Sequence, residues 1–182
     1  MDAAALVARV RDHHIEQFRR FVKGMRRDCS KFASEVKLRL NAKSDLYQAL
    51  YCVDFIKNDP PEIFEMRPDT ILDFAQSMGT FGNAALTIER LVWDDVVLGH
   101  DCPRLDEAAI ADWFRTWFDA EDVRHDPAAG FGNVIHSLNF KPGQISVDFG
   151  TAEPQAFWDM LALLVRSGAT RISVNSSRDP GN

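Results

Sequence analysis

The feature that most constrains this chain is a long amphipathic segment at its start, residues 3–28. Its apolar side chains recur at steps of three and four, the spacing of one face of an α-helix. These side chains are Val7, Val10, His14, Phe18, Phe21 and Met25. Such a helix is about 40 Å long, enough to cross a whole domain. Burying the stripe gains about 1.5–3 kcal/mol for each large side chain, so we expect it to pack on a sheet. The alternative is an exposed basic helix that contacts a membrane or an acidic partner.

The next segment, residues 32–41, changes to a period of two. Alternation of apolar and polar residues is typical of a strand with one buried face. We therefore expect a half-buried strand whose charged side chains face water. Those side chains are Glu35, Lys37 and Arg39.

The middle of the chain is less regular. Residues 45–57 fit a helix or a strand, and we favour a strand because an Asn-Asp-Pro-Pro turn follows and leads to a short strand at 62–66. Asp69 is placed to cap a short helix. We expect the glycines of 79–83 to end that helix, and residues 84–98 to be rich in β-structure.

The second clear helix opens at Asp106-Glu107, where acidic side chains suit the helix dipole. Its apolar face carries Ile110, Trp113, Phe114 and Trp117. Aromatic residues are enriched in binding hot spots, but a domain of this size needs large side chains inside it. We expect this face to belong to the core.

The last third of the chain predicts a hairpin, a helix and a strand. Residues 134–140 and 145–149 flank Pro142-Gly143, a pair suited to the centre of a type II turn. A helix then follows from Pro154, with Gly168 at its C-terminal cap. Residues 169–174 form the closing strand, so the strand, helix and strand make a β-α-β crossover.

Together these elements predict an α+β fold. We expect a mainly antiparallel sheet with the long N-terminal helix and two further helices packed on it, ending in the hairpin, helix and strand. The length suits a single domain, 1–182, in which residues 1–30 form the amphipathic helix and residues 176–182 fray.

Charge is uneven along the chain. Residues 1–31 hold eight Lys or Arg and four acids, whereas the rest holds 13 bases and 23 acids. Acidic surfaces repel nucleic acid and membranes and favour basic partners, so we expect a basic protein partner and neither nucleic acid nor a membrane. Three dispersed cysteines and a start without a signal peptide favour a soluble, cytoplasmic protein with reduced thiols. The sequence leaves the oligomeric state open.

Two His-Asp dipeptides, His100-Asp101 and His125-Asp126, are the candidate metal ligands. Imidazole and carboxylate are the ligands of hydrolytic metal sites, and Asp94 lies close in sequence to the first pair. Their spacing matches no known motif, and loop acids commonly form turns instead. We therefore expect no bound cofactor.

Other histidines and cysteines suggest structural roles. Cys102 and His100 lie two residues apart, but scattered cysteines more often pack in the core than act as nucleophiles. His14 and His136 both fall on apolar faces, where hydrogen-bonded core histidines are expected.

Three functions are compatible with these features. We favour a non-catalytic protein that neutralises or regulates a basic protein partner through its acidic surface, as an acidic immunity protein does with a basic toxin; the analogy is one of charge and size. A metal-dependent hydrolase that uses the His-Asp dipeptides is the second. A membrane-surface or regulatory protein with an exposed basic helix is the third.

Overall fold

The computed structural model describes residues 2–27, 29–41, 43–124, 128 and 130–178. Three helices and two sheets make up an α+β fold. The helices are α1 (Ala3–Arg27), α2 (Glu107–Phe118) and α3 (Pro154–Arg166). None of the helices in these residues combines the length and apolar character needed to cross a membrane.

The three-stranded sheet is an antiparallel meander with the order β1-β2-β3. Its strands are β1 (Phe32–Arg39), β2 (Leu50–Asn58) and β3 (Pro61–Phe64). The strand expected within 45–57 is confirmed as β2, preceded by the short 3-10 helix η1 (Tyr47–Ala49). The strand expected at 62–66 is confirmed as β3.

The six-stranded sheet has the order β4-β5-β9-β6-β8-β7, and its one parallel pair is β5 with β9. Its strands are β4 (Ser77–Phe81), β5 (Ala84–Ile88), β6 (Val96–His100), β7 (Ser137–Lys141), β8 (Gln144–Asp148) and β9 (Arg171–Asn175). The strands thus divide between two sheets, whereas the sequence predicted one.

The C-terminal prediction is confirmed in its main features. Strands β7 and β8 form a hairpin in which Lys141 pairs with Gln144, and Gly143 has the positive φ of 69° that its turn requires. Helix α3 then connects β8 to β9, and both strands run antiparallel to β6, which lies between them.

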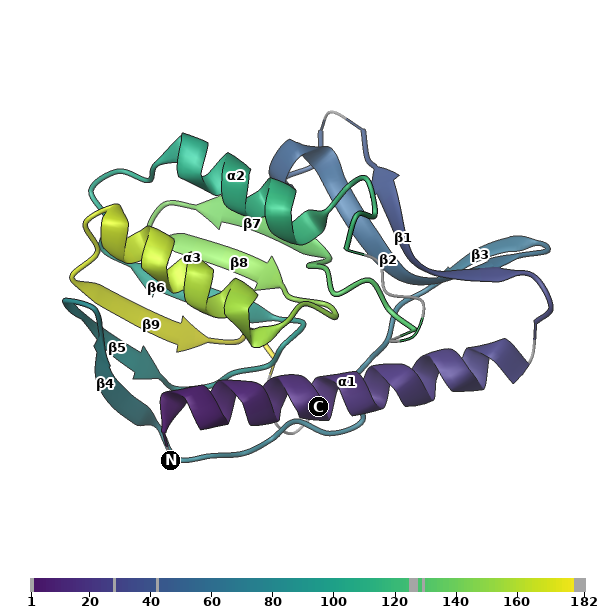
Figure 1. Cartoon of the computed structure of the whole chain (residues 1–182), viewed down its shortest axis with the longest axis horizontal. Coiled ribbons are helices and arrows are strands. Elements are labelled where there is room, and N and C mark those ends of the chain that lie inside the picture. Colours follow the sequence, from purple (N-terminus) through teal and green to yellow (C-terminus); the bar gives the residue numbers. More distant parts are fainter. Residues whose placement is uncertain (1, 28, 42, 125–127, 129, 179–182) are drawn as a thin grey trace.

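Helix α1 lies along both sheets (Figure 1). Its first half contributes Leu6, Val7 and Val10 to the larger core, and its second half contributes Ile15 and Phe18 to a smaller one. The smaller core also contains Phe55 of β2. The amphipathic stripe therefore packs on the sheets, as the sequence predicted, with Phe21 and Met25 only partly buried.

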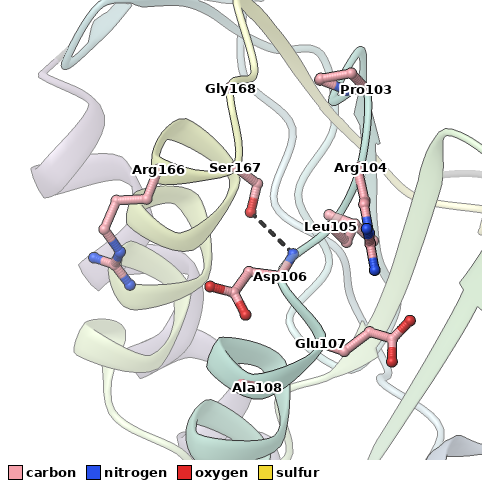
Figure 2. A pocket seen from close by; sticks show the side chains of 9 residues that line it. All are labelled: Pro103, Arg104, Leu105, Asp106, Glu107, Ala108, Arg166, Ser167 and Gly168. Carbon is pink, nitrogen blue, oxygen red and sulfur yellow. Dashed lines mark hydrogen bonds between the residues drawn. The ribbon is translucent and has the colours of Figure 1, made fainter.

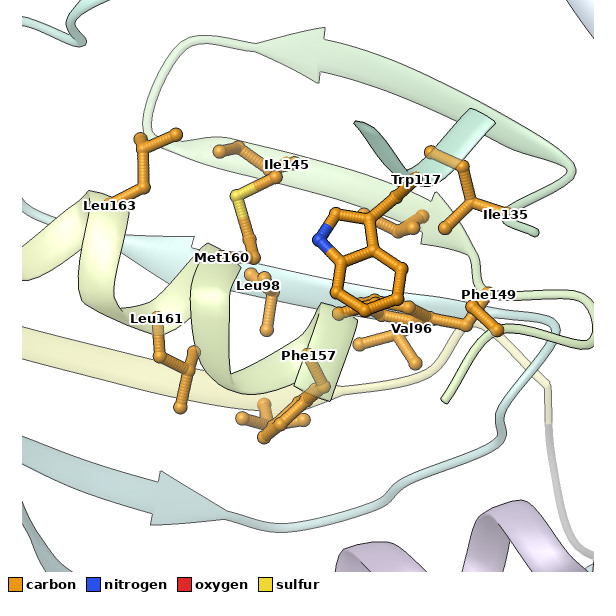
Figure 3. Close-up of a cluster of buried hydrophobic side chains, with 14 of the residues drawn as sticks. Val96, Leu98, Trp117, Ile135, Ile145, Phe149, Phe157, Met160, Leu161 and Leu163 are labelled. Carbon is orange, nitrogen blue, oxygen red and sulfur yellow. The ribbon is translucent and has the colours of Figure 1, made fainter. Parts of the chain in front are cut away.

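The larger core lies between the six-stranded sheet and helices α2 and α3. In Figure 3, Met160 of α3 lies beside Leu98 and Ile145 of the sheet. The aromatic face of α2 belongs to this core, because Trp113, Phe114 and Trp117 are all buried.

The helix predicted from Asp69 is wrong. Both backbone groups of Thr70 bond instead to the side chain of Gln17: the Thr70 N–H donates to Oε1 at 3.1 Å, and Gln17 Nε2 donates to the Thr70 carbonyl at 3.1 Å. Because α1 satisfies these groups, the segment has no need of helical hydrogen bonds. The glycines of 79–83 likewise do not end a helix but belong to the β4–β5 hairpin.

The first residues of the C-terminal segment 176–182 contact the connection before β6. The Asp95 carboxylate accepts hydrogen bonds from the backbone N–H groups of Ser177 and Arg178, at 2.8 and 3.0 Å. Residues 179–182 lie outside the described part of the chain.

Candidate functional site

The first His-Asp dipeptide lies at the end of β6. Asp101 anchors the start of β9, since its Oδ1 accepts the backbone N–H groups of Thr170 and Arg171 at 2.8 and 3.0 Å. The Thr170 hydroxyl also donates to Oδ2, at 2.6 Å. These donors hold the pKa of Asp101 well below its usual range. Asp101 therefore has a structural partner for each oxygen.

Of the remaining metal candidates, only Asp94 lies within the described residues. His125 and Asp126 lie outside the described residues, and Asp94 is paired with Arg178, with Oδ2 and Nη1 2.6 Å apart. Within the described residues, no group of three His, Cys, Asp or Glu side chains is arranged to hold a metal ion.

Cys102 and His100 are close but do not form a nucleophile and base. His100 Nδ1 accepts the backbone N–H of Cys102 at 3.3 Å, and the Cys102 thiol donates to the Leu164 carbonyl at 3.4 Å. Burial raises the pKa of the thiol and lowers that of the imidazole. A catalytic cysteine needs the opposite shift of the thiol pKa, so this pair has a structural role.

Two of the open cavities near this end of the domain adjoin the start of α2. The larger, about 640 Å³, lies between α2 and α3, where the Asp106 N–H donates to the Ser167 hydroxyl at 3.4 Å (Figure 2). The other, about 450 Å³, includes Tyr47, His100 and Phe140 in its lining. Since burial favours neutral His100, these residues offer a surface for contacts rather than an activated chemical group.

A buried ionic cluster joins the two sheets, and the sequence did not reveal it. His136, immediately before β7, contacts two carboxylates: Nδ1 lies 2.9 Å from Oδ1 of Asp54, and Nε2 lies 3.2 Å from Oε1 of Glu35. The side chains of His136, Glu35 and Asp54 are only 2, 5 and 11% exposed. His136 is thus a hydrogen-bonded core histidine, as expected, with partners from β1 and β2.

The burial of Glu35 and Lys37 contradicts the prediction that the charges of 32–41 face water. The Gly132 N–H donates to Glu35 Oε2 at 2.5 Å, and the Thr151 hydroxyl donates to Oε1. Lys37 donates to the Asp119 carbonyl. The loop after α2 therefore covers this face of β1, which strand periodicity alone cannot foresee.

The cluster shifts the pKa values of its members in opposite directions. Burial alone would lower the pKa of His136, but its bonds to Asp54 and Glu35 raise it well above its usual value. Burial alone would raise the pKa of Asp54, but His136 and the Met66 N–H, which donates at 2.6 Å, lower it. The imidazolium form is therefore held between two carboxylates.

Two nearby carboxyl groups have raised pKa values, in contrast to Asp54. Burial raises the pKa of Asp148 to about 8, and burial together with the Asp54 charge raises that of Glu65 to about 7. Shifted groups often mark active sites, but structural ion pairs shift them too. The His136 imidazole is only 2% exposed, so the cluster does not present this imidazole to solvent.

The acidic surface gathers on β3 and the segment that follows it. We define the acidic strip as the exposed carboxylates Asp59, Glu62, Asp69 and Asp73. Arg67 is the only basic residue between positions 59 and 76. Among the ion pairs of the described residues, none includes Glu62, Asp69 or Asp73, and the pair of Asp59 with Lys31 spans 3.8 Å between exposed groups.

Strand β3 is also an edge of its sheet (Figure 1). On the other edge strand, β1, the side chains of Glu35 and Lys37 contact the loop after α2. Within the described residues, no backbone hydrogen bond reaches the outer side of β3, and Ile63 on this strand is 52% exposed. An edge strand of this kind can pair with another chain.

Comparisons with known proteins add nothing to this geometry: no protein-family model, curated protein or solved structure matches the chain.

Proposed function

We propose that this protein is a non-catalytic binding protein that neutralises or regulates a basic protein partner through the acidic strip. The observation that carries the proposal is the set of exposed carboxylates on the uncovered edge strand β3, in the turn before it and in the segment after it. Complementary charge speeds encounter and selects the partner, while the strand edge offers backbone hydrogen bonds.

The chemistry of the strip defines the partner. An extended segment that pairs with β3 would bring its side chains close to Glu62 and the exposed Ile63. Lys or Arg side chains and at least one apolar side chain would complement this surface. The three cysteines are free, which supports a cytoplasmic setting for the interaction.

The two other functions have less support. A hydrolytic metal site at His100 and Asp101 would need ligands from His125 and Asp126, which lie outside the described residues. A membrane-surface role would need the apolar stripe of α1, and that stripe is packed against the sheets.

The proposal is tested with a synthetic extended peptide rich in Lys, with one Ile, titrated into the protein by calorimetry. The triple variant Glu62→Gln/Asp69→Asn/Asp73→Asn should weaken binding at least about tenfold, since complementary charge pairs at interfaces commonly contribute this much. The matched control Glu107→Gln/Glu121→Gln/Glu153→Gln removes the same charge elsewhere and should bind like the wild type.

A second measurement locates the contact. Peptide binding should shift the amide NMR signals of Glu62, Ile63 and Phe64, and raising the salt concentration should weaken it. If both triple variants lose affinity equally, binding depends on net charge alone and the proposal is wrong. If the peptide does not bind, the edge charges serve instead to prevent self-association of β3.

A further inference from the structure

A small cavity of about 20 Å³ lies between α1, the segment 68–72 and the segment 91–94. His14 of α1, Ile71 and Leu72 contribute to its lining, together with Trp93 and Asp94 from the connection before β6. Roughly 10–15 Å³ is enough to hold one water molecule. The cavity therefore has room for one such molecule and for no larger ligand.

Three buried polar atoms belong to side chains that line this cavity. Within the described residues, His14 Nε2, Trp93 Nε1 and Asp94 Oδ1 have no hydrogen-bond partner. His14 and Trp93 are 5 and 1% exposed, and the Asp94 side chain is 8% exposed. Buried polar groups in folded proteins are almost always paired, so three such atoms at one cavity indicate a common partner.

The hydrogen-bonding capacity of the three atoms defines that partner. The indole Nε1–H of Trp93 can only donate, and a carboxylate oxygen of Asp94 accepts. Burial lowers the pKa of His14 to about 3, so its imidazole is neutral and Nε2 donates or accepts according to the tautomer. A metal ion cannot accept from an indole, and an anion cannot donate to a carboxylate. A water molecule does both.

We propose that one ordered water molecule occupies this cavity. It accepts a hydrogen bond from Trp93 Nε1–H, donates one to Asp94 Oδ1 and forms a third bond with His14 Nε2. Internal waters typically make about three such bonds.

The water joins parts of the chain that make few direct polar contacts. It links the middle of α1 to the connection between β5 and β6. Through Asp94, whose other oxygen lies 2.6 Å from Arg178, it also links α1 to the chain after β9. The site thus helps to hold the long helix at one position along the six-stranded sheet.

The test uses the indole signals of the ¹⁵N-labelled protein. NOESY and ROESY spectra at the water frequency should show a cross-peak at Trp93 Hε1 with the signs of a long-lived dipolar contact rather than of proton exchange. Trp113 is the internal control, because its buried Nε1–H already donates to the Ala156 carbonyl at 3.1 Å. It should show no such cross-peak.

Trp93→Phe should remove the signal and so assign it; if that variant does not fold, through-bond correlation in the wild type assigns it instead. The proposal would be overturned if the Trp93 Hε1 signal had no water cross-peak. It would also be overturned if the water cross-peaks of Trp93 and Trp113 were the same. A cross-peak to a resonance other than water would show that a different molecule occupies the cavity and would also overturn it.

Discussion

The ionic cluster at the junction of the sheets makes the most direct prediction about stability. Replacing His136 by Leu removes the cation and leaves Glu35 and Asp54, 5 and 11% exposed, without a counter-charge. Removing one partner of a buried ion pair costs about 3–5 kcal/mol. The Glu35 oxygens keep the Gly132 and Thr151 donors, so the carboxylates are not wholly unsolvated. We expect His136→Leu to lower the free energy of unfolding by this amount at pH 6.

The pH dependence of the unfolding free energy provides a second test of this prediction. The pKa of His136 is raised by folding, so its contribution is complete below its ordinary value of 6.5 and is lost as pH rises through the folded value. The pKa of Asp54 is lowered, so its contribution is present above 3.8 and is lost as pH falls through the folded value. Between about pH 4.5 and 6 both contributions in the wild type are therefore constant.

The variant should behave differently over the same interval. Without His136, burial raises the pKa of Asp54, and this carboxylate can take up a proton as the pH falls. The loss of unfolding free energy caused by the substitution should therefore shrink between pH 6 and 4.5. Asp148, whose folded pKa of about 8 would rise further without the His136 charge, is protonated in both folded proteins over this interval. Glu65 keeps its neighbour Asp54 in both proteins.

Urea unfolding followed by tryptophan fluorescence measures both effects. Thr116→Val is the control, because it removes one neutral hydrogen bond and no titratable group, and it should cost at most about 0.5–1.5 kcal/mol without this pH dependence. If His136→Leu costs no more than the control, or its deficit is the same at both pH values, the buried ion pair does not stabilise the junction.

Three further predictions follow. Gly150→Ala should cost about 2–4 kcal/mol in thermal melts, because φ is +48° and a Cβ would lie 2.2 Å from an imidazole carbon, whereas Gly79→Ala, with open space around it, should be nearly neutral. Phe18→Ala should cost about 3–5 kcal/mol in urea unfolding and the half-buried Phe21→Ala clearly less; equal losses would contradict the packing of α1. Elemental analysis should find no stoichiometric zinc or manganese in the purified protein, and metal that is lost on His100→Ala would show the opposite.

The sequence by itself determined the helices and strands whose formation depends on a pattern of neighbouring residues. The stripe of α1, the alternation around Pro142-Gly143 and the apolar face of α3 each repeat with the period of their own secondary structure, and each is found where the pattern placed it. The burial of the α2 aromatics follows from the same periodicity, combined with the need to fill a large core.

Only the tertiary structure decided which charges are buried and how the strands divide between two sheets. Glu35 has the sequence context of a solvent-facing strand residue, yet it meets His136 across 101 positions of the chain. The segment around Thr70 has a helix cap in its sequence, yet it bonds to Gln17 of α1. In both cases the partner is distant in sequence. The free energy of the tertiary contact outweighs a local conformational preference of at most about 1 kcal/mol. The junction of the two sheets is built from such contacts.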